Sequence, residues 1–195
     1  MKQQMAGLRY ELDGDHEYDF VEGVLDGPMA DDVASLAKDQ SFYYYWHPDT
    51  FEHMAQSLKQ LDTYLQTDGP FDVLVAFSAG ALLVALHLLN KSKRGEPLPF
   101  RCAIFICTAG RLVEAAKAAG LDLGQDKEQP MRLLELPTVH IRGASDRAEP
   151  TGSQELAQLC DPMSSQTVVH PGAHEFPKAE HLTQAVHAIR KAVAP

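Results

Sequence analysis

The stretch Phe71-Asp-Val-Leu-Val-Ala-Phe-Ser-Ala-Gly-Ala81 decides the fold of this chain. Its apolar first half predicts a buried strand, and the Ala- and Leu-rich residues 79–90 predict a helix directly after it. Ser78 then stands at a sharp corner between strand and helix, where its hydroxyl is pushed out above the sheet edge. Because such a turn is crowded, we expect small residues two positions before and after the serine, and Ala76 and Gly80 stand there.

Strands and helices alternate on both sides of this corner. We expect strands over 18–25, 71–77, 101–108, 137–142 and 166–170, and helices over 2–12, 51–66, 79–90, 111–120, 152–160 and 181–193. Several of these strands are continuous apolar runs, which is typical of a parallel sheet covered on both faces. The sequence therefore predicts an α/β fold with three layers, a mostly parallel sheet between helices, in one domain over 1–195.

Composition excludes several classes of partner. The chain has 195 residues, with 17 Lys and Arg against 27 Asp and Glu, so its net charge is −10. A chain this acidic does not favour nucleic acid or an anionic membrane surface, both of which need clustered basic side chains. No apolar stretch is long enough to span a bilayer, and the N-terminus lacks the apolar region of a signal peptide. We expect a soluble, cytoplasmic protein.

The three cysteines fit buried thiols of a reducing compartment. Cys102 and Cys107 fall in one predicted strand with opposite parity, so we expect them on opposite faces of the sheet. Their spacing matches no metal motif, and we expect neither a metal nor an organic cofactor.

Three chemically apt residues follow three of the predicted strands. Ser78 comes directly after its strand, Asp146 ends the turn Gly143-Ala-Ser-Asp146, and His174 ends the loop His170-Pro-Gly-Ala-His174. Because the carboxyl ends of parallel strands meet at one edge, we expect these side chains to converge. In a Ser-His-Asp arrangement His174 takes the proton of Ser78 and returns it to the leaving group, while Asp146 orients the imidazole. The backbone N–H of Ala79 would then be one oxyanion donor.

Each of these residues has a structural alternative. Ser78 could cap the following helix, and Asp146 could be an ordinary turn residue. Among nine histidines, His170 is the nearest rival base, whereas His140 in a strand and His87 in a helix are better explained as structural.

The motifs resemble those of the FSH-type fungal serine hydrolases, a branch of the α/β-hydrolase superfamily. The resemblance rests on Phe71-Asp-x3-Ala-Phe-Ser-x-Gly-Ala81, Gly143-x2-Asp146 and His170-Pro-Gly-x-His174, and it extends from about residue 8 to 189. It implies hydrolysis of an ester or thioester. The aromatic stretch 42–51 is similar to the polyketide-pathway branch, whose thioesterases imply a polyketide acyl substrate and a synthase carrier domain as partner.

One departure from this family concerns the start of the chain. Members open with a strand and a His-Gly loop that lends the second oxyanion N–H, and no His-Gly precedes Ser78. Loss of one donor costs about a hundred- to a thousandfold in rate. We therefore expect a domain that is N-terminally short, with its first strand missing and an open sheet edge beside an apolar seam. Either the protein begins earlier, or the chain is a weakened relative that binds an acyl ligand or a partner protein.

The aromatic residues 42–46 allow two interpretations. They could line an acyl pocket, since ligand sites are mostly apolar, or they could pack an irregular segment onto the core. A nucleotide-binding domain is the remaining alternative, and it would need a Gly-rich phosphate loop after the first strand, which Asp26-Gly27-Pro28 does not provide.

Overall fold

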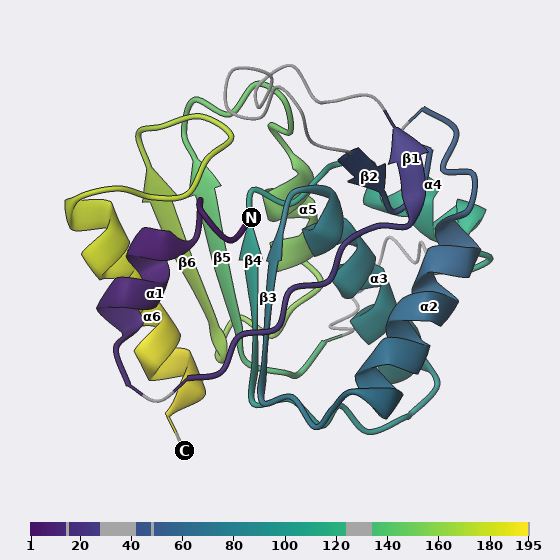
Figure 1. Cartoon of the computed structure of the whole chain (residues 1–195), viewed down its shortest axis with the longest axis horizontal. Coiled ribbons are helices and arrows are strands. Elements are labelled where there is room, and N and C mark those ends of the chain that lie inside the picture. The colour runs from purple at the N-terminus through teal and green to yellow at the C-terminus, as the bar shows by residue number, and fades with distance from the viewer. Residues whose placement is uncertain (15, 28–41, 48, 124–133, 195) are drawn as a thin grey trace.

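The structure is a computed structural model that describes residues 1–14, 16–27, 42–47, 49–123 and 134–194. Its centre is a parallel sheet of four strands in the order β3-β4-β5-β6 (Figure 1). The strands are β3 (Val73–Phe77), β4 (Cys102–Ile106), β5 (Thr138–Gly143) and β6 (Ser165–His170). Their registers align the carboxyl ends, for example Phe77 opposite Ile106, so the loops that follow the strands share one edge.

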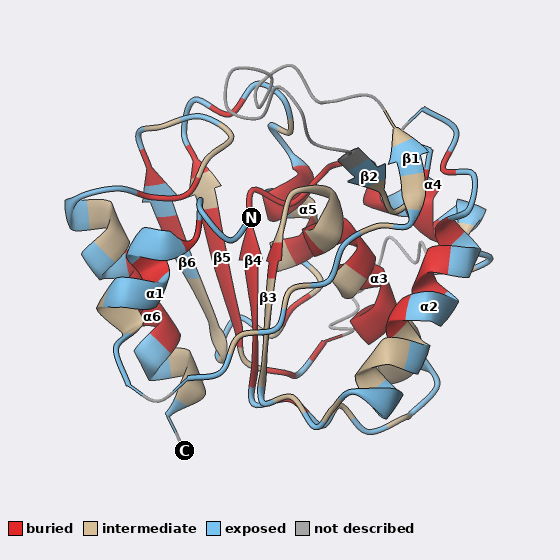
Figure 2. Cartoon of the chain, viewed as in Figure 1, coloured by how far each residue is buried: buried red, intermediate tan, exposed pale blue. Residues whose placement is uncertain are grey.

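Helices cover both faces of this sheet, as the sequence predicts. One face carries α2 (Met54–Thr67), α3 (Ala79–Lys93), α4 (Leu112–Ala118) and α5 (Gly152–Ala157), and the other carries α1 (Ala6–Leu12) and α6 (Glu180–Val193). Successive residues of β4 face opposite ways: Phe105 packs with the α2–α5 layer, whereas Ile104 and Ile106 pack with α1 and α6. Figure 2 shows β4 and much of β5 buried between the two layers.

The four strands predicted after residue 70 are confirmed, with boundaries that differ by one or two residues. Each of the six predicted helices is also present, although α1 begins only at Ala6 and α5 ends at Ala157. The segments 28–41 and 124–133, which the sequence leaves irregular or without a clear period, lie outside the described residues.

The predicted strand over 18–25 is wrong for residues 18–24. Only β1 (Leu25–Gly27) forms, and it pairs antiparallel with β2 (Phe42–Tyr44) in a separate small sheet. Phe20 packs against the core, but Val21 is 40% and Val24 58% exposed. The segment runs beside β3 without joining the four-stranded sheet, so residues 18–24 have no strand to pair with (Figure 1).

Within the described residues β3 is the edge of the four-stranded sheet. A cavity of about 1010 Å³ lies along it, between the extended residues 16–21 and the strand, and is lined also by apolar residues of α2 and α3. The open edge and apolar seam that the sequence predicts are therefore present beside the strand that carries Ser78.

Among the described residues, no helix is both long enough and apolar enough to cross a bilayer.

Candidate active site

Ser78 occupies a strained corner between β3 and α3. Its backbone has φ 53° and ψ −121°, a conformation that a residue with a side chain adopts at a cost of about 1–3 kcal/mol. The surroundings hold it there, because the N–H of Ser78 donates to the carbonyl of Ile106 at 2.9 Å and its own carbonyl accepts from Ala109 at 3.2 Å. The hydroxyl makes no capping bond to α3, so the helix-cap interpretation of Ser78 is wrong.

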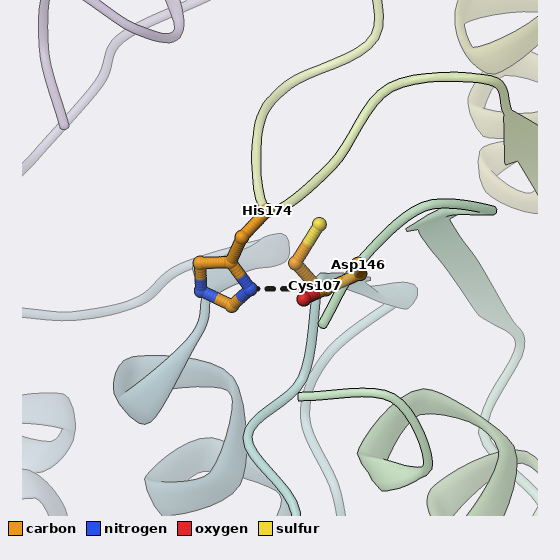
Figure 3. Close-up of side chains that lie close together, drawn as sticks. All are labelled: Cys107, Asp146 and His174. Carbon is orange, nitrogen blue, oxygen red and sulfur yellow. Dashed lines mark hydrogen bonds and ion pairs between the residues drawn. The ribbon is translucent and has the colours of Figure 1, made fainter. Parts of the chain in front are cut away.

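The hydroxyl of Ser78 instead contacts an imidazole. Nε2 of His174 lies 2.8 Å from Oγ of Ser78, and Nδ1 of His174 lies 2.8 Å from Oδ2 of Asp146 (the latter contact is drawn in Figure 3). The three residues follow β3, β6 and β5, so the aligned strand ends bring together side chains up to 96 positions apart in sequence. A base in contact with a hydroxyl, and an acid in contact with that base, is an arrangement that can activate a nucleophile.

Asp146 is held as a carboxylate. Burial by itself would raise the pKa of this group, but the N–H groups of Glu149 and Ala148, together with the bond to His174, hold its pKa below the usual value. The charged form is therefore the one that faces the imidazole at neutral pH, as an orienting acid requires. Asp146 is thus more than a turn residue, although its Oδ1 also closes the turn to Ala148 and Glu149.

The loop of His174 is fixed against the loop of Asp146. The N–H of Ala144 donates to the carbonyl of His170 at 2.7 Å, and that of Ser145 donates to the carbonyl of Gly172 at 3.0 Å. Phe77 supports the imidazole from the sheet side, with ring centroids 5.1 Å apart. These contacts fix the position of the His174 ring before any substrate arrives.

The rival histidines lie elsewhere. His170 is buried, and burial lowers its pKa; its Nε2 has no hydrogen-bond partner within the described residues. His140 stacks on Phe105 inside the sheet, and His87 is buried in α3. Burial lowers the pKa of both to about 4, which keeps them neutral at physiological pH, as expected for structural histidines.

Ala79 is the first residue of α3 and directly follows the corner. Its N–H belongs to the first helical turn, whose donors have no acceptor inside the helix. Gly80 is less restricted than the sequence predicts: a Cβ there would lie 3.6 Å from Cε2 of Tyr45, an ordinary van der Waals distance. Crowding at the corner therefore does not itself demand glycine at this position.

Comparison with known proteins identifies the family of this chain. Residues 1–186 match the sequence model described as serine hydrolase (FSH1). The chain belongs to the serine hydrolase (FSH1) family. Esterase FPY3 of Fusarium mangiferae is 29% identical over 199 residues, which cover 99% of this chain and 90% of that esterase. Esterase alnB of Emericella nidulans is 22% identical, over 96% of this chain and 89% of alnB.

Solved structures agree on the fold of this FSH1-family protein. A carboxylesterase from Mesorhizobium loti superimposes with a TM-score of 0.52 at 16% identity, covering 87% of this chain and 71% of the carboxylesterase. The α/β-hydrolase fold predicted from the sequence is thereby confirmed. Family and esterase relatives together make the chain a serine hydrolase of the esterase or thioesterase class.

The aromatic residues 42–46 include one that packs into the core and one that borders a cavity. Trp46 is buried and packs against Phe51, with ring centroids 6.5 Å apart, so it belongs to the core of this FSH1-family protein. Tyr45 borders the cavity beside β3, and its hydroxyl donates to the carbonyl of Val21 at 2.9 Å. Tyr45 therefore lines a space large enough for a ligand.

The sequence missed one residue of the site. Cys107 does not lie on the face predicted from its parity but packs in the same cluster as Cys102, on the α1 and α6 side. The alternation fails because β4 ends at Ile106 and Cys107 has φ 47°. Its Sγ, the carboxylate of Asp146 and the imidazole of His174 have potential ligand atoms within 4.8 Å of one another (Figure 3).

This set could hold a soft metal ion only at a cost. The imidazole and carboxylate already bond to each other, and burial raises the pKa of Cys107 to about 11, so its thiol is neutral rather than the thiolate that binds metals.

Proposed function

We propose that this FSH1-family hydrolase cleaves its ester or thioester through an acyl-enzyme on Ser78, with His174 as general base and acid and Asp146 as the orienting carboxylate. The contacts of 2.8 Å on both sides of the His174 ring are the observation that carries this mechanism. They supply a proton acceptor for the hydroxyl and a fixed tautomer for the acceptor.

The proton moves twice in this scheme. Nε2 of His174 takes the proton as Oγ of Ser78 attacks the acyl carbon, and it then gives that proton to the departing alcohol or thiol. Water repeats the sequence on the acyl-enzyme and releases the acid. The N–H of Ala79, at the positive end of α3, stabilises the oxyanion in both steps.

Active-site labelling tests the nucleophile directly. A fluorophosphonate probe should modify Ser78, and Ser78→Ala should lose the adduct together with at least about a thousandfold of esterase rate. Ser164→Ala is the matched control, because its hydroxyl bonds to Asp161 within its own turn, and it should label and react as the wild type. An adduct on another residue, with activity retained in Ser78→Ala, would refute the mechanism.

The acyl group is proposed separately. We infer a polyketide acyl chain on a carrier-protein thioester, supported by the aromatic stretch at 42–51 and by the cavity that Tyr45 and Gly80 border. Rates with an acyl-pantetheine thioester and with the matching p-nitrophenyl ester test this. Failure to hydrolyse the thioester while the p-nitrophenyl ester is hydrolysed would exclude the carrier-bound substrate without affecting the assignment of Ser78.

A second candidate function follows from the edge strand β3. The chain could bind an acyl ligand without turning it over, because the sheet edge beside Ser78 is open within the described residues and a second oxyanion donor is not evident from the sequence. A p-nitrophenyl ester assay separates the two: a wild-type rate equal to that of Ser78→Ala favours binding alone, and a higher one excludes it.

A further inference from the structure

Cys107 directly follows β4, where hydrogen bonds hold the backbone. Its N–H donates to the carbonyl of Ile141 at 2.8 Å, which ties it to the neighbouring strand β5. The next residue is also anchored, because the N–H of Thr108 donates to Oγ of Ser153 at 3.0 Å. The side chain of Cys107 therefore extends from a rigid base, and it is only 1% exposed.

This side chain reaches the loop that carries His174. Sγ of Cys107 lies 3.5 Å from the carbonyl oxygen of Glu175 and 4.0 Å from that of Ala173. These are the residues on either side of His174, and the N–H of Glu175 itself donates to the carbonyl of Ala173 at 2.9 Å. His174 is thus the middle residue of a tight turn, and one thiol contacts the carbonyls at both of its ends (Figure 3 shows Cys107 beside His174).

The thiol has the protonation state that a donor needs. Burial, the largest influence, raises the pKa of Cys107 to about 11, and the charge of Asp146 acts in the same direction. A neutral S–H can donate to a carbonyl oxygen, whereas a thiolate would be repelled by the oxygens of Ala173 and Glu175.

We propose that Cys107 is a positioning residue: its thiol donates to the carbonyl of Glu175 and lies against that of Ala173, and so holds the turn that presents the His174 imidazole to Ser78. This proposal rests on the proposed function of His174 and Ser78. A base displaced by a fraction of an ångström loses alignment with the hydroxyl, and small misplacements of catalytic groups are costly in rate.

Four variants test the role. Cys107→Ala and Cys107→Gly remove the donor, and glycine also accepts the positive φ at this position without strain. Cys107→Ser keeps a donor. Cys102→Ala is the matched control, because it removes the same atom from the same buried cluster at the other end of β4.

We expect the two donor-free variants to lower kcat for a p-nitrophenyl ester by on the order of tenfold, with KM changed less than about twofold. Cys107→Ser should stay within about threefold of the wild type, since its hydroxyl replaces the donor. The low-field proton NMR signal of the His174 Nδ1–H should broaden or vanish in the donor-free variants and persist in Cys107→Ser and Cys102→Ala. Loss of packing alone would not produce this pattern.

Two results would overturn the proposal: wild-type kcat with an unchanged low-field signal in whichever donor-free variant folds, or an equal loss of kcat in Cys102→Ala. Failure of the mechanism itself is recognised separately, because Ser78→Ala would then remain active. An inactive Ser78→Ala together with a fully active Cys107→Ala would reject the role of Cys107 alone.

Discussion

Asp146 combines two tasks that a single substitution can separate. Its Oδ1 closes a turn by accepting the N–H groups of Ala148 and Glu149, whereas its Oδ2 faces the imidazole of His174. Asp146→Asn keeps an oxygen for the turn but removes the charge, and the amide favours the wrong imidazole tautomer. We expect kcat to fall by on the order of 10³–10⁴ with the fold retained. Esterase assays beside circular dichroism would measure this, with the exposed Asp26→Asn on β1 as the control.

Much of the site could be predicted from single residues. The order of Ser78, Asp146 and His174, each after a predicted strand, was enough to predict convergence, because parallel strands align their carboxyl ends. Cys107 could not be predicted in the same way. Its side-chain direction depends on a backbone φ of 47°, and a parity rule assumes that the strand continues regularly.

At the scale of elements, the end of β5 and the loop after β6 pack so closely that a side chain between them is excluded. A Cβ on Gly143 would lie 2.1 Å from the carbonyl oxygen of Ala173, next to His174. We therefore expect Gly143→Ala to displace this loop and to lower both the melting temperature and kcat, the latter by tenfold or more in keeping with about 1 Å of misplacement. Gly95→Ala is the control: it meets no atom within 4 Å and carries only the cost of its positive φ.

Equal losses of kcat in the two glycine variants would show that contact with the His174 loop is not the cause, because a Cβ at Gly95 meets no atom within 4 Å. Thermal melts and ester kinetics on the same samples distinguish the two cases.

The strand predicted over 18–25 is the element for which the sequence-based prediction failed. Residues 18–24 carry the apolar residues Phe20, Val21 and Val24 that favour a strand, but a strand also needs a partner, and composition says nothing about whether one lies within reach. Here the segment stands across a cavity from β3, and Val24 is exposed. The central strands β4 and β5 were predicted correctly because they are buried on both faces, which makes their apolar runs nearly continuous.

At the scale of the whole molecule, the same burial that builds the core makes the protein sensitive to acid. His87 and His140 are 4% and 1% exposed, and burial lowers the pKa of each to about 4. In the unfolded chain their pKa is about 6.5. Between these values the unfolded state binds protons that the folded state does not, so the free energy of unfolding must fall as the pH is lowered from about 6.5 toward 4.

The pH dependence of the free energy of unfolding can be assigned to individual histidines by mutation. Each histidine contributes up to about 1.4 kcal/mol per pH unit in that window. His140→Leu, which keeps an apolar contact with Phe105, should therefore remove about half of the slope contributed by the pair, whereas the exposed His187→Gln on α6 should leave it unchanged. Urea unfolding at pH 7.5 and pH 5 measures both. The lowered pKa of Asp146 acts in another window, because its stabilisation is present above the unfolded pKa of about 3.8 and is lost only below it. A wild-type slope in His140→Leu between these two pH values would mean that other groups take up the protons.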